Sequence, residues 1–282
     1  MGFIIGDNCK IHPSVFINVE SGFLGAGSVV NEGVRIEGSI VKIGREAFID
    51  RNASIGGGSC FDPQAFLRAG DWFHMGLQSH INIARGVTVG HEFGCGIETK
   101  LFTHGAYIDS FSLGAPTQWA QISIGNSVWM PNAWVNPGVT VGNNVIVAAR
   151  SLVNKDIPDN SLAGGTPCRI LKENYFPRSL SEAQQRKHLE SIFQQSLLRL
   201  QKNYPKETSP PSFSFENGVA RIKVDSLTSE FHMLERSICG PCTEISRMFK
   251  DQLRRNGIRF RSAELSGEWS SWGENPLHLF NK

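Results

Sequence analysis

The sequence lacks several features that would assign it to a class of protein. No run approaches the roughly 18 apolar residues of a membrane span, so we expect no transmembrane segment. The formal net charge is only +2, which argues against nucleic acid as a partner. Six cysteines are scattered over 282 residues, too sparsely for a disulfide framework, so we expect reduced thiols and a cytoplasmic protein. No charged and then apolar leader precedes Ile5, so we also expect no signal peptide.

What the sequence does contain is a six-residue repeat, clearest from Ile124 to Pro158. A branched apolar residue returns about every sixth position, and Gly, Ala, Asn or Pro mostly follows it. A helix would repeat its apolar face every three or four residues and a strand every two, so neither explains the pattern. Short strands joined by tight corners do explain it, with three hexads closing one coil of a parallel β-helix.

The repeat begins at Ile5 and contains one long gap. The inward-facing anchors expected before this gap include Ile43, Ile49, Ile55, Phe61, Leu67, Phe73, Ile83, Val89, Cys95 and Leu101. The interval from Leu101 to Ile124 is too long for one hexad, so residues 104–121 are expected to leave the coil as a loop. The remainder of residues 5–158 makes about seven and a half coils of about 18 residues each.

The pattern changes after Pro158. Leu180–Tyr204 is expected to be a helix capped by Ser181, because Leu189, Ile192, Phe193, Leu197 and Leu200 mark one apolar face. A linker rich in Pro and Ser follows. We therefore predict a mainly β chain, with a β-helix domain at 1–175, a helix at 176–204 and a small α+β module at 205–282.

The expected module begins with a hairpin. Asn217-Gly218 lies between the apolar segments 213–215 and 219–224, which is a strong hairpin signal. Residues 241–255 are expected to form a second helix that Asn256-Gly257 ends, and residues 258–260 are a candidate returning strand.

Four sequence words carry a resemblance to a known family. They are Ile-Gly-Asn-Ser-Val-Trp from Ile124, Val-Asn-Pro-Gly-Val-Thr-Val-Gly from Val135, Val-Asn-Lys-Asp-Ile-Pro from Val153 and Gly-Gly-Thr-Pro-Cys-Arg-Ile from Gly164. They closely resemble the hexapeptide-repeat acyltransferases of the left-handed β-helix superfamily, which include many sugar acetyltransferases. The resemblance implies a left-handed coil, a homotrimer, acetyl-CoA as co-substrate and no metal.

The resemblance also implies a catalytic residue. His104, in Leu101-Phe-Thr-His-Gly-Ala-Tyr, stands where such enzymes carry a histidine that acts as general base. The acceptor must lose a proton as it attacks the thioester carbonyl of acetyl-CoA, and an imidazole titrates near neutral pH. The alternative is that His104 is a loop residue without a catalytic role.

Further residues match family positions that contact the two substrates. Those expected along CoA, with cations near its phosphates, are Asn132, Ala149, Asn154, Lys155, Arg169 and Lys172. Those expected near the acceptor are Asn82, Tyr107 and Trp119, although corner asparagines such as Asn82 are often structural. The hexad Met130–Trp134 is one residue short, which makes Asn132 the doubtful member of the CoA set.

The interpretation is a CoA-dependent acetyltransferase that acts on a hydroxyl or amine of a sugar, in surface-polysaccharide or glycoconjugate synthesis. The loop lacks the second histidine of maltose-type enzymes, which favours a nucleotide-linked or lipid-linked sugar. The alternative is a non-catalytic β-helix scaffold with a partner-binding module.

Two other kinds of site are disfavoured by the residues. His74, His80, His91 and His104 contain no pair separated by four residues, which argues against a zinc site of the γ-carbonic anhydrase kind. Cys239-Gly-Pro-Cys242 spells a thioredoxin-type redox motif, but the remaining chain is too short for that fold, and a chance occurrence at a helix start is the favoured interpretation.

Overall fold

The computed structural model describes residues 2–203 and 210–271. Their contacts divide the chain into two compact units, with the division between Arg178 and Ser179. The first unit contains the six-residue repeat and the second contains both helices. No helix in the described ranges is long and apolar enough to cross a membrane.

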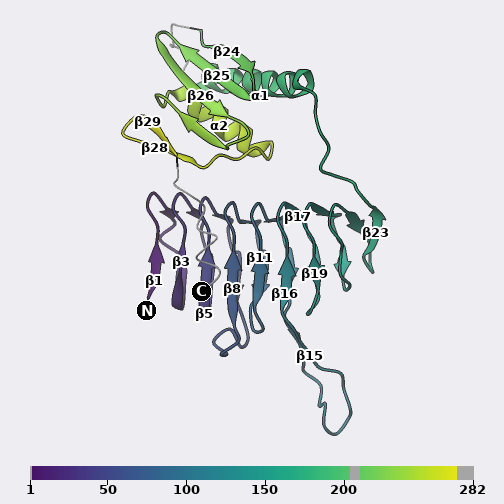
Figure 1. Ribbon diagram of the computed structural model, residues 1–282. Helices are drawn as coiled ribbons and strands as arrows, with labels where there is room; N and C mark the ends of the chain where they lie inside the picture. The colour runs from purple at the N-terminus through teal and green to yellow at the C-terminus, as the bar shows by residue number, and fades with distance from the viewer. Residues whose placement is uncertain (1, 204–209, 272–282) are drawn as a thin grey trace. The chain divides into compact units, whose positions relative to one another are not determined.

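The first unit is a parallel β-helix, in which short strands of successive coils stack side by side (Figure 1). A 12-stranded sheet forms two of its walls and a nine-stranded sheet forms the third. The two walls are joined because the long strands β3 and β5 continue from one to the next, so that β5 pairs with both β7 and β8. The fold class predicted from the sequence is confirmed: a mainly β, left-handed coil of hexapeptide rungs with an extruded loop.

The strands of the coil are short and regularly spaced. Those of the 12-stranded sheet are β1 (Phe3–Ile5), β3 (Phe16–Leu24), β5 (Arg35–Ile43), β7 (Ser54–Gly56), β8 (Phe66–Ala69), β10 (His80–Asn82), β11 (Val87–Val89), β13 (Lys100–Leu101), β16 (Ile122–Ile124), β18 (Trp134–Val135), β19 (Thr140–Val141) and β21 (Leu152–Val153). Those of the nine-stranded sheet are β2 (Lys10–Ile11), β4 (Val29–Val30), β6 (Phe48–Ile49), β9 (His74–Met75), β12 (Gly94–Cys95), β17 (Val128–Met130), β20 (Val145–Val147), β22 (Leu162–Gly164) and the antiparallel β23 (Arg169–Lys172).

Anchors of successive coils pack on one another through the centre of the prism. Ile55, Ile81, Leu101, Val135 and Val153 are paired in register along one wall, and all are almost fully buried. Each buried anchor removes apolar surface from water, worth about 1.5–3 kcal/mol per side chain. The repeat in the sequence is therefore the repeat of the core.

The coils approach each other closely at one corner. A Cβ built on Gly70 would lie 2.7 Å from the backbone nitrogen of His91 and 2.8 Å from the carbonyl carbon of Gly90. No side chain fits at that separation, so glycine at this corner is required by the spacing of the coils.

The expected anchor frame is wrong in one place. Residues 57–65 leave the coil as a series of turns, and Phe61 is 44% exposed. The frame restarts at Ala69, which pairs with Ile43, and continues through Met75 and Ile81. Leu67 and Phe73 are buried, but each lies two residues before an anchor. Phe61 was predicted to be an anchor only because it lies six residues after Ile55.

The second departure from the coil is the one that the sequence predicts. After β13 the chain forms an antiparallel ladder between β14 (His104–Gly105) and β15 (Gln118–Trp119), and the intervening residues form a long exposed loop. Figure 1 shows this segment projecting from the lower edge of the coil, where residues 57–65 also emerge.

The second unit is a small α+β module. Its antiparallel sheet has the order β24 (Ser212–Glu216), β25 (Val219–Val224), β26 (Leu227–His232) and β27 (Ser237–Cys239), and a separate pair is formed by β28 (Ser262–Leu265) and β29 (Glu268–Ser271). The predicted hairpin turn is confirmed, with Asn217 and Gly218 both at positive φ.

Two helices belong to this unit, α1 (Glu182–Asn203) and α2 (Glu244–Arg255). Ser181 caps α1, since its backbone N–H donates to Gln184 Oε1 at 2.9 Å and its hydroxyl accepts from the Gln184 N–H at 3.3 Å. Leu189, Ile192 and Phe193 of α1 are buried in the same core as Phe231 and Phe249. The structure therefore groups α1 with the C-terminal module.

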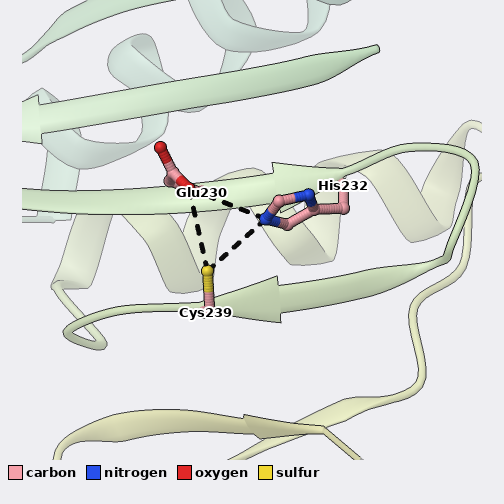
Figure 2. A group of neighbouring side chains, drawn as sticks. All are labelled: Glu230, His232 and Cys239. Carbon is pink, nitrogen blue, oxygen red and sulfur yellow. Dashed lines mark hydrogen bonds and ion pairs between the residues drawn. The ribbon is translucent and has the colours of Figure 1, made fainter.

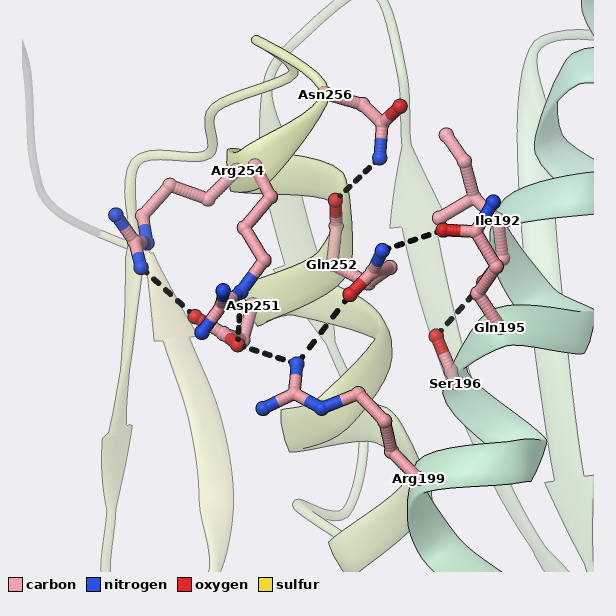
Figure 3. Close-up of polar contacts among 9 residues, drawn as sticks. Ile192, Gln195, Ser196, Arg199, Asp251, Gln252, Arg254 and Asn256 are labelled. Carbon is pink, nitrogen blue, oxygen red and sulfur yellow. Dashed lines mark hydrogen bonds and ion pairs between the residues drawn. The ribbon is translucent and has the colours of Figure 1, made fainter.

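Polar contacts also join α1 to α2 (Figure 3). Arg199 donates to Asp251 Oδ2 at 2.7 Å, and Gln252 donates to Gln195 Oε1 at 2.5 Å. Burial raises the pKa of Asp251, but hydrogen bonds from Arg199, Arg254 and Arg255 outweigh that effect and hold the pKa well below its ordinary value.

The second helix differs from the expectation at its start. Its N-cap is Thr243, so Cys239 ends β27 and Cys242 precedes the helix. Residues 258–260 do not form a strand, and the next strand begins at Ser262. The expected linker at 204–209 lies outside the described residues.

Candidate active site

His104 stands where the chain leaves the coil, at the first position of β14. Its ring is half-buried, and its Nδ1 lies 3.0 Å from Asn82 Oδ1. Asn82 ends β10, one coil earlier in the chain, and is only 3% exposed. The pair therefore joins neighbouring coils at the base of the extruded segment.

The protein fixes the orientation of the Asn82 amide. Its Oδ1 accepts from the Ala84 backbone N–H at 3.3 Å, and its Nδ2 donates to the Gly58 carbonyl at 3.2 Å. Since the oxygen can only accept, the proton in the contact with His104 must sit on Nδ1. The Nε2 of His104 then carries a free lone pair, as a general base requires.

A buried threonine extends this network. Thr103 donates its hydroxyl proton to Asn82 Oδ1 at 2.5 Å, and its Oγ1 accepts from the Arg85 backbone N–H at 3.2 Å. Thr103 is fully buried. The oxygen that accepts from His104 is thus held from several sides by the coil and has little freedom to turn.

Trp119 holds the other side of the imidazole. The two rings are nearly parallel, with centroids 4.5 Å apart and an interplanar angle of 11°. The Arg85 guanidinium lies 4.4 Å from the Trp119 ring and donates to Asp62 Oδ2 at 3.0 Å. The stack positions His104, and the arginine adds a cation–π contact to it.

Both departures from the coil contribute to this arrangement. Gly58 and Asp62 come from residues 57–65, and His104 and Trp119 come from the base of the extruded segment. Asn82 and Arg85 lie between them in the sequence and contact both. The shorter departure therefore supports the histidine that the longer one carries.

An open hollow of about 380 Å³ lies next to His104. Its walls are formed by Phe102, His104, Gly105, Pro116, Thr117, Gln118, Trp134, Asn136 and Pro137. Trp134 is 53% exposed and also borders a second hollow of about 310 Å³, with Asn132, Arg150 and Thr166. The short hexad thus places an indole between the two hollows.

A third hollow, of about 460 Å³, gathers three of the residues expected along CoA. Asn154, Lys155 and Arg169 all line it, together with Cys168. Two cations at one concave surface suit the phosphates of a nucleotide. Residues 150–152 and Thr166 line the second hollow, and the residues that follow them in the sequence, 154–157 and 167–170, line the third.

The remaining expected residues lie elsewhere. Ala149 is exposed at a corner, and Lys172 lies 5.8 Å from the Tyr175 ring and lines none of the three hollows. Tyr107 is fully exposed on the loop. Asn82 is buried, and its amide oxygen and nitrogen contact His104 and the Gly58 carbonyl.

The sequence reasoning missed Arg85, Thr103 and Arg150. Arg85 and Thr103 act through contacts between coils, which no local pattern reveals. Arg150 could have been found, since it is a cation at the corner one residue after the expected contact Ala149.

The other histidines of the coil have separate surroundings. His74 stacks on Phe48, with ring centroids 5.2 Å apart, and His91 accepts from the Asp71 N–H at 3.0 Å. His80 contacts Ser54 at 2.8 Å, and burial together with the nearby Lys100 lowers its pKa. Among the histidines of residues 2–203 and 210–271, His104 is the one that pairs and stacks with Trp119 at the base of the extruded segment.

Comparisons with known proteins match parts of the chain. Over 53 residues it is 51% identical to galactoside O-acetyltransferase of Escherichia coli (strain K12), a match that covers 18% of this chain and 26% of that protein. Over 107 residues it is 32% identical to the putative lipopolysaccharide biosynthesis O-acetyl transferase WbbJ of the same strain, covering 33% of this chain and 54% of that protein. The chain thus spans between about a quarter and about half of the length of these relatives.

Among solved structures, one similar chain is a point mutant of AntD, an N-acyltransferase from Bacillus cereus, in complex with dTDP and coenzyme A. It is 17% identical with a TM-score of 0.47, covering 69% of this chain and 92% of that one. No model of a known protein family matches the chain.

The hexapeptide rungs and the extruded histidine segment agree with these partial sequence matches. Over parts of its length the chain is similar to hexapeptide-repeat acyltransferases. Both of these relatives carry names of O-acetyltransferases, one of them putative.

Proposed function

We propose that this protein is a CoA-dependent acetyltransferase that acts on a hydroxyl or amine of a sugar. The observation that carries the proposal is the contact between His104 Nδ1 and the fixed Oδ1 of Asn82. It holds the imidazole in the tautomer that accepts a proton at Nε2, beside an open hollow. A coil without catalysis would have no need of this arrangement.

The chemistry follows from that geometry. Nε2 of His104 takes the proton of the acceptor as its oxygen or nitrogen attacks the thioester carbonyl. The tetrahedral intermediate collapses, the carbon–sulfur bond breaks and the acetyl group stays on the acceptor. The imidazolium returns its proton to the departing CoA thiolate, so the enzyme ends as it began. A positioned general base of this kind contributes about 10²–10⁴ in rate.

We propose that CoA lies along the hollows between Trp134 and Arg169. Lys155 and Arg169 would contact its phosphates, with Asn154 beside them, and Asn132 and Arg150 would line the path towards the thioester. Ala149 would contact CoA through its backbone. Lys172 would reach the nucleotide only by leaving the Tyr175 ring.

The acceptor is proposed to be a nucleotide-linked or lipid-linked sugar of polysaccharide or glycoconjugate synthesis. The hollow beside His104 is lined by the polar side chains of Gln118 and Asn136 together with the indole of Trp134, a mixture that suits a sugar. The names of the matched relatives, which concern galactosides and lipopolysaccharide, support this class of acceptor.

We also propose a cytoplasmic homotrimer. The extruded loop exposes Tyr107, Ile108, Phe111 and Leu113 to solvent, which is a large apolar area for an isolated loop. A second copy of the coil would cover it and would place Tyr107 near a neighbouring acceptor site. The sparse cysteines support the cytoplasm.

The test is an assay of acetyl transfer from acetyl-CoA to each of a panel of nucleotide sugars. The rate is measured from the release of free CoA thiol. His104→Ala should lower kcat about 10²–10⁴-fold and leave the KM for acetyl-CoA nearly unchanged. His188→Ala, which changes an exposed histidine of the second unit, is the matched control and should retain full activity. Activity of His104→Ala within a few-fold of wild type would contradict the assignment.

The scaffold alternative has its own measurement. Acetyl-CoA should raise the thermal midpoint of the wild-type protein, because a ligand that binds only the folded state stabilises it. Lys155→Ala and Arg169→Ala should reduce that rise. No change in midpoint at millimolar acetyl-CoA would favour a scaffold without catalysis.

A further inference from the structure

Three side chains of the second unit converge at one point (Figure 2). Glu230 and His232 are two residues apart on β26, so they share a face of the sheet. Cys239 of β27 lies directly opposite Glu230 in the strand register. The residue between the first two, Phe231, points into the core and is fully buried. The cluster therefore stands on the outer face of a well-packed sheet.

The spacing of the three donor atoms is that of ligands around a small cation. Cys239 Sγ lies 3.5 Å from His232 Nε2 and 3.9 Å from Glu230 Oε2, and Nε2 lies 3.6 Å from Oε2. Tetrahedral zinc with bonds of about 2.3 Å to sulfur and about 2.0–2.1 Å to nitrogen and oxygen separates its ligands by about 3.3–3.6 Å. Shifts of a few tenths of an ångström would complete that geometry.

The orientation of the groups does not fit a nucleophilic cysteine. In a catalytic Cys–His pair, a carboxylate would hold the opposite ring nitrogen of the histidine. Here both Sγ and the carboxylate face the same atom, Nε2.

A fourth residue holds the carboxylate in place. Arg221 on β25 donates from Nε to Glu230 Oε1 at 2.6 Å. This contact occupies one oxygen and leaves Oε2 facing the histidine and the cysteine. An arginine that orients a carboxylate ligand in this way is typical of the surroundings of metal sites.

We propose that Glu230, His232 and Cys239 bind one divalent cation of the zinc class, with a fourth position open to water. One sulfur, one imidazole nitrogen and one carboxylate oxygen form a donor set that suits Zn²⁺ and its analogue Co²⁺. The side chains of Glu230 and His232 are each about a third exposed, which leaves an entry path. Binding releases the thiol proton to solvent, because thiolate is the ligand form.

The site is distinct from the Cys239-Gly-Pro-Cys242 motif. Cys242 is 9% exposed and lies near Arg247 and Glu264, apart from the three ligands. Within residues 2–203 and 210–271, the three ligands form the group whose donor atoms all lie within 4.8 Å of one another. The motif contributes one thiol to the proposed site, not a dithiol.

The experiment is a titration of the untagged full chain with Co²⁺ under reducing conditions. One equivalent should produce the near-ultraviolet charge-transfer band of a cobalt thiolate and the visible bands of tetrahedral cobalt. Zn²⁺ should then remove both. A folded wild-type protein that shows no cobalt–thiolate band at millimolar Co²⁺ would overturn the proposal.

Variants decide which residues hold the cation. Cys239→Ser should abolish the charge-transfer band, and His232→Asn should abolish or greatly weaken it. Both side chains are partly or fully exposed, so circular dichroism should match wild type. Cys168→Ser, a half-buried cysteine of the coil, is the control and should behave like wild type. An undiminished band in Cys239→Ser, or equal loss in Cys242→Ser, would overturn the assignment in favour of another thiol or a dithiol.

Discussion

Asn82 contacts the His104 ring and fixes its orientation, although 22 positions separate them in the sequence. An imidazole that is free to turn presents either nitrogen, and half of its orientations are unproductive. The amide of Asn82 is fixed by Gly58 and Ala84, and it passes that constraint to the histidine. A residue that is only 3% exposed thus fixes the orientation of a half-buried imidazole.

Asn82→Asp tests this role through the pH dependence of the rate. A carboxylate at this position would stabilise the imidazolium, so His104 would lose its proton at higher pH. The acid limb of the profile of kcat against pH should move upward by about one to two pH units. Asn8→Asp, an exposed asparagine of the first coil, should leave the profile unchanged.

Asn82→Ala separates positioning from charge. It removes the hydrogen bond without adding a carboxylate, so kcat should fall about 10- to 100-fold, a part of the ~10²–10⁴ from the base. The acid limb should move less than in Asn82→Asp, and the KM for acetyl-CoA should change little. Equal profiles for wild type and Asn82→Asp would contradict the proposed contact.

The close stacking of the coils leaves no room for a side chain at some of their glycines. At Gly70 an added methyl group would meet the backbone of the next coil at 2.7 Å. At Gly58, on the shorter departure, an added methyl group would meet nothing within 4 Å. The two glycines therefore form a matched pair for measuring what the close stacking of coils requires.

Gly70→Ala should lower the free energy of unfolding of the coil by about 1–3 kcal/mol, because the coils must separate to accept the methyl group. Gly58→Ala should change it by less than about 0.5 kcal/mol. Differential scanning calorimetry of both variants measures the difference. Equal thermal midpoints would show that the corner is looser than these distances imply.

The pair of helices depends on charge as well as on packing. Asp251 accepts from Arg199 of α1 and from Arg254 and Arg255 of its own helix. Since its folded-state pKa is depressed, the stability that it contributes is present above its unfolded value of about 3.9. That stability is lost as the pH falls from there towards the folded value.

Asp251→Asn should therefore cost about 1–2 kcal/mol at pH 7, a figure reduced from that of buried pairs because the carboxylate is about a third exposed. The difference from wild type should shrink below about pH 4, as measured by denaturant unfolding across pH. Asp225→Asn, at an exposed turn, is the control. A penalty that persists unchanged at pH 3 would contradict the electrostatic explanation.

The elements also show how far the sequence alone predicts this protein. The period of six identified the coil, and the break after Leu101 identified the extruded segment, because spacing reports burial directly. The prediction that Phe61 is a buried anchor was wrong, because an apolar residue at the expected interval can also lie on an exposed turn. Position 104 followed from the resemblance, whereas the roles of Asn82 and Arg85 depend on contacts between coils that no local pattern contains.

For the whole molecule, the proposed assembly predicts a mass. Light scattering should give about three times the chain mass of 31.1 kDa. Phe111→Ser should weaken association, because Phe111 is almost fully exposed on the loop that a second copy would cover. Leu234→Ser, which changes another exposed apolar residue in the second unit, should leave the mass unchanged. A wild-type monomer at micromolar concentration would contradict the trimer.

The dependence of one departure from the coil on the other has a consequence for engineering. An enzyme designer who transplants only residues 103–121 into another hexapeptide coil would carry over the imidazole and its stacked indole, but not the amide that aligns it or the turns that hold the amide. Such a chimera should fold and bind its ligands yet turn over poorly. Moving residues 57–65 and 82–85 along with the loop should restore the rate. These three segments, although separated in the sequence, must therefore be transferred together.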